Sequence, residues 1–91
     1  QKVLGANGPV LVDFYADWCG PCRMIGHVLE QLASEYPTAQ SVKVNVDDSP
    51  NLAAKYRIES IPALLVFQDG QVVNQHVGVA DKARLRALLG L

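Results

Sequence analysis

The pattern of apolar and polar residues predicts two kinds of strand in the first half of the chain. Residues 10–15, VLVDFY, form an almost continuous apolar run of strand length in which Asp13 is the exception. Such runs are typical of strands covered on both faces, as in a parallel sheet between helices. Residues 42–46, VKVNV, alternate instead, which predicts a strand with its valines on one face and its polar residues on the other.

The second half of the chain contains a predicted β-hairpin. Residues 63–67, ALLVF, form another apolar run, and Asp69-Gly70 follows it as a strong turn signal. Valines recur from residue 72 to residue 77, and this segment is predicted to be the return strand.

Apolar residues recur with helical spacing directly after the segment that contains the cysteines. The polar residues between them fall on the opposite side, and Pro37 ends the element. The face predicted to be buried consists of Ile25, Val28, Leu29, Leu32 and Tyr36.

Two shorter helices are predicted from their capping signals. Residues 47–50, DDSP, combine a capping residue with a proline suited to the first turn, and the helix continues to about Tyr56. Asp81 is predicted to cap the last helix. The buried side of that helix is expected to include Leu85, Leu88 and Leu89.

The resulting order of elements is β-α-β-α-β-β-α within 91 residues, which fits one domain over residues 1–91. The strand-helix-strand crossover favours parallel neighbours at the start, whereas the hairpin is antiparallel. The sequence therefore predicts an α/β fold with a mixed central sheet that is flanked by helices on both faces.

Composition and charge argue against several classes of function. Eight Lys and Arg residues against nine Asp and Glu residues give a net charge of −1, which does not favour nucleic acid or anionic lipid. No apolar run approaches the roughly 18 residues that span a bilayer. We therefore expect no nucleic-acid partner and no membrane association.

Both cysteines lie within residues 16–24, ADWCGPCRM. Two cysteines are too few for the disulfide framework of a small secreted scaffold. A bridge closing about four residues would stabilise the fold by only roughly 2 kcal/mol, against about 3 kcal/mol for a 15-residue loop. The pair is therefore poorly placed as a structural staple.

The position of the pair favours redox chemistry. Cys19 follows a strand and a short loop, and Pro21 suits the first helical turn, so Cys19 is placed at the helix N-terminus. Free N–H groups and the helix dipole favour a thiolate there, and such cysteines can have pKa values of roughly 3.5 to 7.5 instead of about 8.5. Cys22 shares one face of the turn. We expect Cys19 to be the exposed attacking sulfur and Cys22 to be the resolving one.

Two alternatives stay open on the residues alone. A metal site would need two more ligands, and the histidines, His27 and His76, lack the close pairing that is usual in zinc modules. His27 is predicted to face solvent, and no metal is expected. The second alternative is an inert pair of buried cysteines.

Taken together, these segments resemble the thioredoxin family. The matching motifs are VLVDFYADWCGPCRM at 10–24, KVNVD at 43–47, SIPALLVF at 60–67, DG at 69–70 and VG at 77–78. The match covers nearly all of the chain, and Cys-x-x-Cys near a strand-helix-strand unit is itself a thioredoxin-like sign. The resemblance implies a thioredoxin fold. It also implies that the chain begins inside the family's first helix, so that the usual first strand is lacking.

The resemblance implies a protein-disulfide reductase that acts on client proteins through its redox-active disulfide, without another cofactor. In the family, a flavin-dependent reductase returns electrons from NADPH. We expect a donor of this thioredoxin-reductase type, a monomer, and a cytoplasmic location, with the periplasm as the alternative. The rival interpretations are a tethered reductase with a dedicated client and a thioredoxin-like binding module of a larger chaperone or assembly.

The resemblance also assigns roles to two charged residues. Asp13 corresponds to the buried carboxylate behind the family's active site, where burial would raise its pKa and let it accept a proton from Cys22. The alternative is an aspartate at a strand end that reaches solvent. Lys43 corresponds to the lysine near this carboxylate, whereas alternation alone favours a solvated strand lysine.

The remaining expected site residues would contact the client. Pro62 corresponds to a proline that is cis in the family and faces the disulfide, which would leave the Ile61 backbone available to an extended client segment. Gly20 and Pro21 match the dipeptide of reducing members. An apolar collar around the sulfurs would comprise Trp18, Ile61, Val77 and Gly78. For the tryptophan, the alternative is a ring that caps the core.

Some positions depart from the family pattern. His27 stands where a proline that kinks the helix is common, so a bend in this helix is not predicted. Gly26, inside the same helix, is expected to cost about 1 kcal/mol relative to alanine. Ala63 replaces the usual threonine, and Tyr15 replaces a common tryptophan.

Overall fold

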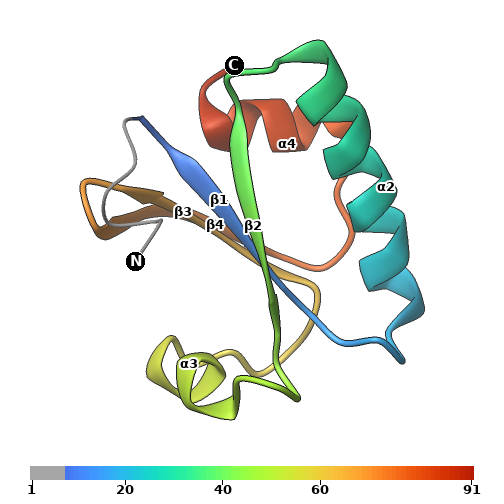
Figure 1. Ribbon diagram of the computed structural model, residues 1–91, viewed down its shortest axis with the longest axis vertical. Helices are drawn as coiled ribbons and strands as arrows, with labels where there is room; N and C mark the ends of the chain where they lie inside the picture. The colour runs from blue at the N-terminus through green and yellow to red at the C-terminus, as the bar shows by residue number, and fades with distance from the viewer. Residues whose placement is uncertain (1–7) are drawn as a thin grey trace.

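The computed structural model describes residues 8–91, and its elements follow the predicted order (Figure 1). The strands are β1 Val10–Tyr15, β2 Gln40–Asn45, β3 Ala63–Gln68 and β4 Gln71–Val77. The helices are α2 Gly20–Glu35, α3 Pro50–Lys55 and α4 Lys82–Leu89. The expectation that the chain begins inside the family's first helix lies outside the described residues.

The strands form one four-stranded mixed sheet in the order β2-β1-β3-β4. β1 is parallel to β2 and antiparallel to β3, and the hairpin of β3 and β4 is antiparallel, with an irregularity between Val66 and Phe67. The predicted pairing is therefore confirmed. β1 is a central strand, and its C-terminal end leads directly into the cysteine motif.

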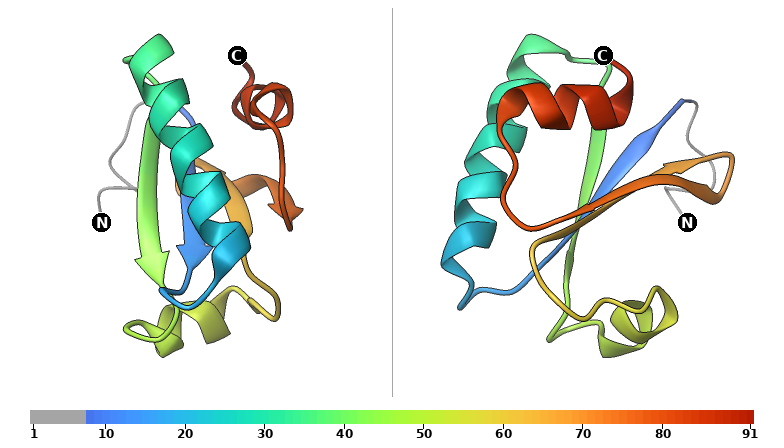
Figure 2. Two further views of the ribbon diagram at one scale, coloured as in Figure 1. Left: turned by 90° about the vertical axis from the view of Figure 1, so that its right-hand side faces the viewer. Right: turned by 180° about the vertical axis from the view of Figure 1, so that it is seen from behind.

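Each face of the sheet buries its own apolar cluster. On one face, Leu11 of β1 and Leu64 of β3 pack against the apolar sides of α2 and α4. On the other face, Phe14 and Phe67 pack with Tyr56, which directly follows α3, and the ring centres of Tyr56 and Phe67 lie 5.3 Å apart. Figure 2 shows α2 and α4 side by side, with α3 apart from them. Helices thus flank both faces, although none of the six residues of α3 is buried.

α2 buries the face that its sequence spacing predicts. Ile25, Leu29 and Leu32 are buried, and Val28 and Tyr36 pack partly against the same cluster. The helix extends without interruption over 16 residues, through Gly26 and His27. None of the helices within residues 8–91 is long and apolar enough to cross a membrane.

α4 begins and ends at well-defined caps. Asp81 is the N-cap, as predicted, and its Oδ1 accepts the backbone N–H of Arg84 at 2.9 Å. The helix ends at Gly90, whose φ of 74° lies in the left-handed region that favours glycine. At the start of α3, by contrast, the side chain of Ser49 makes no capping hydrogen bond.

Candidate active site

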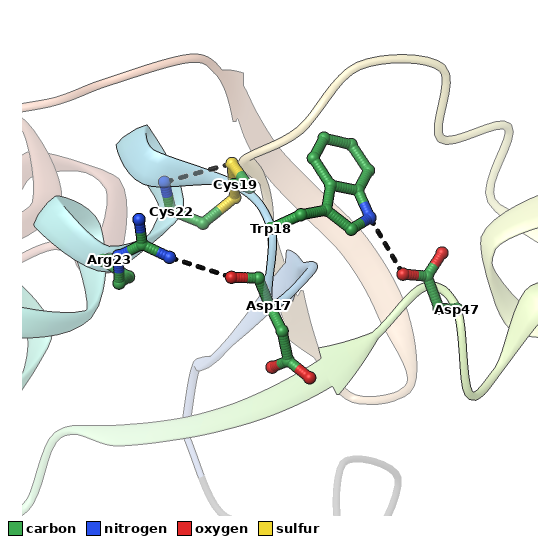
Figure 3. The surroundings of a disulfide bond; sticks show 6 residues. All are labelled: Asp17, Trp18, Cys19, Cys22, Arg23 and Asp47. Atoms are coloured by element: carbon green, nitrogen blue, oxygen red, sulfur yellow. Dashed lines mark hydrogen bonds between the residues drawn. A yellow bond between two sulfur atoms is a disulfide. The ribbon is translucent and has the colours of Figure 1, made fainter.

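The two cysteines meet at the N-terminus of α2 (Figure 3). Residues 16–18 connect β1 to Cys19, whose backbone N–H donates to the carbonyl of Ala16 at 3.1 Å. Cys19 is the N-cap residue, and its Sγ accepts the backbone N–H of Cys22 at 3.2 Å. The two residues form a disulfide with a Cα–Cα separation of 5.3 Å, within the usual range of roughly 4.4–6.8 Å.

This position favours negative charge on the sulfur of Cys19 in the reduced protein. The first N–H groups of a helix have no acceptor within the helix, and the helix dipole adds partial positive charge at the same end. Gly20 and Pro21 occupy the first turn of α2, which carries no acidic side chain that would repel a thiolate. The cap therefore favours a thiolate at Cys19 over one at Cys22.

The expectation that Cys19 is the exposed sulfur is wrong. Cys19 is 5% exposed and Cys22 is 4% exposed, so the two residues are buried alike. Both belong to a small buried cluster with Ala16. The side chains that pack against this cluster and cover it are Tyr15, Val46 and Ile61. The two sulfurs differ in their place at the helix N-terminus rather than in exposure.

Asp13 is fully buried in β1. It lies on the same face of the strand as Leu11, which packs against α2. Neither carboxylate oxygen has a hydrogen-bond partner among the described residues. Burial raises the pKa of Asp13 from 3.8 to about 6, while the charge of Lys43 acts to lower it. The alternative of an aspartate that reaches solvent is therefore wrong.

Lys43 is the register partner of Asp13 on the neighbouring strand β2. The side chain is exposed, and its Nζ lies 4.4 Å from the centre of the Tyr15 ring. A Cβ atom placed on Gly26 would lie 4.0 Å from the same Nζ, so the ammonium group lies alongside α2. Lys43 is thus a solvated strand lysine that is also close enough to influence Asp13.

The loop before β3 approaches the disulfide. The peptide bond between Ile61 and Pro62 is cis, as predicted, and Ile61 packs against the cysteine cluster. The N–H of Gly78 donates to the carbonyl of Pro62 at 2.8 Å, which ties the end of β4 to this loop. Val77, just before it, is 61% exposed. Among residues 8–91, no backbone group pairs with the N–H or C=O of Ile61.

Two contacts hold the loop between β1 and α2, and neither was predicted (Figure 3). Trp18 is 70% exposed, and its indole N–H donates to Oδ2 of Asp47 at 3.0 Å. Arg23 donates from Nη1 to the carbonyl of Asp17 at 2.8 Å. The tryptophan is therefore a surface residue and does not cap the core. Asp47 is 29 positions away along the chain, so no local sequence signal identifies this partner.

The geometry does not favour a metal site. Within the part of the chain that the structure describes, no group of three or more His, Cys, Asp or Glu could hold a metal ion. His27 faces solvent, as predicted, with its Nδ1 3.5 Å from a carboxylate oxygen of Glu30. His76 lies on β4, where its Nε2 is 3.2 Å from the carbonyl of Val79.

Comparison with known proteins decides the family. The sequence profile described as Thioredoxin matches residues 1–90. The chain belongs to the thioredoxin family. A thioredoxin from Pyropia yezoensis is 47% identical over 90 residues, which cover 98% of this chain and 84% of the relative. Thioredoxin C-2 from Corynebacterium nephridii is 51% identical over 88 residues, or 96% of this chain and 82% of the relative.

A solved structure confirms the fold. A mutant thioredoxin from Halobacterium salinarum aligns with a TM-score of 0.84 at 44% sequence identity, over 91% of this chain and 73% of that one. The mixed sheet and its flanking helices are thus a thioredoxin fold, with four strands within residues 8–91.

The activity that the resemblance implies is also confirmed. The chain is a thiol-disulfide oxidoreductase that reduces protein disulfides, with Cys19 and Cys22 as its redox-active pair. Thioredoxins in general reduce disulfide-containing clients and are reduced in turn by thioredoxin reductase. The alternative of a binding module without redox chemistry is not favoured.

Proposed function

We propose that Cys19 attacks the client disulfide and that Cys22 resolves the resulting mixed disulfide. The Cys19 thiolate forms a bond to one client sulfur, and the other client sulfur leaves as a thiolate that takes up a proton. Cys22 then loses its proton and attacks Sγ of Cys19, which breaks the bond to the client and releases its second thiol. The client gains two electrons and two protons, and the protein ends as the disulfide.

One observation carries this order of attack: Sγ of Cys19 is the N-cap acceptor of α2, with the N–H of Cys22 as its donor. A hydrogen bond to a charged acceptor is stronger than one to a neutral acceptor, so the same N–H favours the thiolate over the thiol. Cys22 lies inside the helix, where its sulfur has no comparable cap position.

We propose that Asp13 accepts the proton of Cys22 during the second step. Its pKa of about 6 leaves most of the carboxyl groups ionised near neutral pH, while the affinity for a proton exceeds that of an ordinary aspartate. The buried, unpaired oxygens on the face beneath α2 support this role. Lys43 would keep the pKa from rising further and so preserve the ionised base.

We propose that the client segment lies across the loop before β3. The unpaired backbone of Ile61 offers a donor and an acceptor to an extended client segment, as in β-strand addition. The surface beside it would consist of Trp18, Gly20, Pro21, Val77 and Gly78. Pro62, which was also expected there, is fully buried and would hold the loop in place without contacting the client. The large exposed fractions of Trp18 and Val77 support a contact role, since such side chains gain most from being covered by a partner.

We further propose that a reductase of the thioredoxin-reductase type supplies the electrons, and that the domain over residues 1–91 works as a monomer without a resident cofactor. A cytoplasmic location fits this cycle, because the pair must return to its dithiol form after each turnover and reducing compartments keep thiols reduced.

Trapping tests the order of attack. Cys22→Ser should accumulate a covalent mixed disulfide between Cys19 and a client such as insulin, visible by mass spectrometry and released by dithiothreitol. The matched variant Cys19→Ser should accumulate none. If Cys19→Ser traps clients and Cys22→Ser does not, the proposed roles are reversed. Noncovalent client binding that persists when both cysteines are serine would support the binding-module alternative.

A further inference from the structure

A hollow of about 280 Å³ lies beside β4 on the face of the sheet that α3 covers only in part. We call it the β4 pocket. Its floor includes Ala63 and Leu65 of β3, which are 2% and 5% exposed. Its walls include Tyr56 and Ser60 from the loop after α3, and Gln75 and Val77 from β4. α3 ends at Lys55, and the segment that follows it, residues 56–60, lines the hollow.

The β4 pocket is continuous with the disulfide-exchange site through two segments. Ser60 directly precedes Ile61, which packs against the cysteine cluster. Val77 pairs with Ala63 in the hairpin register and directly precedes Gly78, whose N–H binds the carbonyl of Pro62. A client segment that reaches the sulfurs over Ile61 is therefore within one or two residues of the pocket rim.

The size of the β4 pocket and its aliphatic floor favour a single side chain with an apolar tip, whereas the exposed rim carries polar groups such as Ser60 and Gln75. The volume is below the roughly 300–1,000 Å³ of sites for drug-sized ligands. The buried floor is aliphatic, and Ile58 and the Tyr56 ring add apolar wall. The charged residues at the lining, Arg57 and Glu59, have opposite signs, so the pocket gives no preference for a charged group.

We propose that the β4 pocket binds one aliphatic side chain of the client, within four residues of the attacked cysteine, and so contributes to client selection. Side chains of an extended segment point alternately to opposite sides, so a client paired with Ile61 presents every second side chain to the protein. The proposal rests on the proposed client surface at Ile61. It adds a specificity position that lies outside the collar around the sulfurs.

Peptide disulfides of defined sequence test the proposal. Each peptide carries one cysteine, linked to thionitrobenzoate, and a single leucine in an otherwise alanine background at one of the four positions on either side. Wild-type protein should reduce the peptide with leucine at one position with a kcat/KM roughly 5- to 20-fold above the all-alanine peptide. Uniform kcat/KM values across all positions would overturn the proposal.

Two tryptophan variants localise the effect. Gln75 and Asn74 are both exposed on β4, but they lie on opposite faces of the strand, and Gln75 lines the pocket. Gln75→Trp should fill the pocket and reduce the leucine preference to less than about twofold, while Asn74→Trp should retain it. A preference that survives Gln75→Trp would overturn the proposal.

A small disulfide without flanking residues, bis-thionitrobenzoate, separates this proposal from the proposed function. All three proteins should reduce it at the same rate, which also shows that the variants are folded. If wild-type protein reduces the small disulfide but shows no positional preference, the pocket proposal alone fails. If it reduces neither substrate, the proposed function fails and the pocket proposal fails with it.

Discussion

The N-termini of α2 and α4 have the same pattern of capping hydrogen bond, but their N-cap side chains differ in chemistry. In α4, Oδ1 of Asp81 accepts the N–H of Arg84 at 2.9 Å, and in α2, Sγ of Cys19 accepts the N–H of Cys22 at 3.2 Å. In both helices the N-cap side chain binds the backbone N–H three residues later, as in ordinary capping.

The difference lies in the chemistry of the acceptor. Asp81 is exposed and only holds the end of a helix. Cys19 is buried, and its sulfur, which is bonded to that of Cys22, is the acceptor. The N-cap of α2 has no carboxylate. The carboxylate on this side of the sheet is that of Asp13, which is buried in β1. An ordinary helix N-cap therefore becomes a redox-active position when the capping residue is a cysteine, whose sulfur can form and break a disulfide.

The largest effect is expected when the reactive cap is replaced by a purely structural one. Serine is a favoured N-cap residue of similar size, so Cys19→Ser should keep α2 capped and remove the attacking sulfur. Dithiothreitol-driven reduction of insulin should fall to the rate of buffer alone. The free energy of unfolding, from urea titration, should stay within about 1 kcal/mol of that of the reduced wild-type protein. Catalysis by this variant would mean that the cap sulfur is not the nucleophile.

The buried carboxylate beneath α2 should give the next largest effect, and it should depend on pH. Asp13 has a pKa of about 6 in the folded protein against 3.8 ordinarily, so the native state holds this proton more tightly than the unfolded state does. Stability therefore falls as pH rises from about 4 to about 6, and a penalty of roughly 3 kcal/mol is fully present above pH 6. Asp13→Asn removes this titration. The difference in the free energy of unfolding, Asp13→Asn minus wild type, should therefore increase by about 3 kcal/mol from pH 4 to pH 8.

Lys43→Met provides the control, because it removes the charge that lowers the pKa of Asp13. Lys43 lowers the pKa of Asp13, so its removal should move the stability change to a pH above 6. Urea titrations across this pH range measure both effects. A stability difference between Asp13→Asn and wild type that does not vary with pH would contradict the assigned pKa.

Short-range patterns in the sequence account for much of the fold. Periodicity placed the buried face of α2, and the aspartate at position 81 identified the start of α4, because helix spacing and capping act within a few residues. The burial of Asp13 followed from its place inside an apolar run, as one polar residue cannot turn such a strand toward solvent. The cis bond before Pro62 was predicted from the resemblance, since cis bonds occur in only about 5–6% of cases before proline.

Contacts between distant segments account for what the sequence did not reveal. Cys19 is buried by Val46 and Ile61, which come from two loops far along the chain, so local position suggested an exposed sulfur. Residues 47–50 were predicted only to contain a helix cap, whereas the structure also pairs Asp47 with Trp18. Both outcomes depend on how β1, β2 and β3 bring their ends together, which no local pattern encodes.

A smaller effect is expected at the structural cap. Asp81→Ala leaves the N–H of Arg84 without its side-chain acceptor and should lower the free energy of unfolding by about 1 kcal/mol. Insulin reduction should be unchanged, because this cap is not part of the exchange site. Asp81→Ser should recover most of the stability, since serine also caps helices. If Asp81→Ala lost activity without losing stability, the N-cap of α4 would not be purely structural.

The smallest effect concerns the glycines of the same two helices. Gly26 lies in the interior of α2, whereas Gly90 ends α4 with a φ of 74°. A Cβ atom at position 26 would lie 4.0 Å from Nζ of Lys43, an ordinary contact distance. Gly26→Ala should therefore raise the free energy of unfolding by up to about 1 kcal/mol, because alanine loses less backbone entropy in a helix.

Gly90→Ala is the matched control for Gly26→Ala, and its sign should be opposite. Alanine in the left-handed conformation at position 90 costs roughly 1–2 kcal/mol, so the α4 variant should be destabilised although nothing lies within 4 Å of the added Cβ. Urea titration at one pH measures both variants. Destabilisation by Gly26→Ala would mean that the contact with Lys43 is tighter than 4.0 Å implies. In that case the close packing of α2 on β2 would leave no room for a side chain at position 26. Glycine would then be required there for steric reasons.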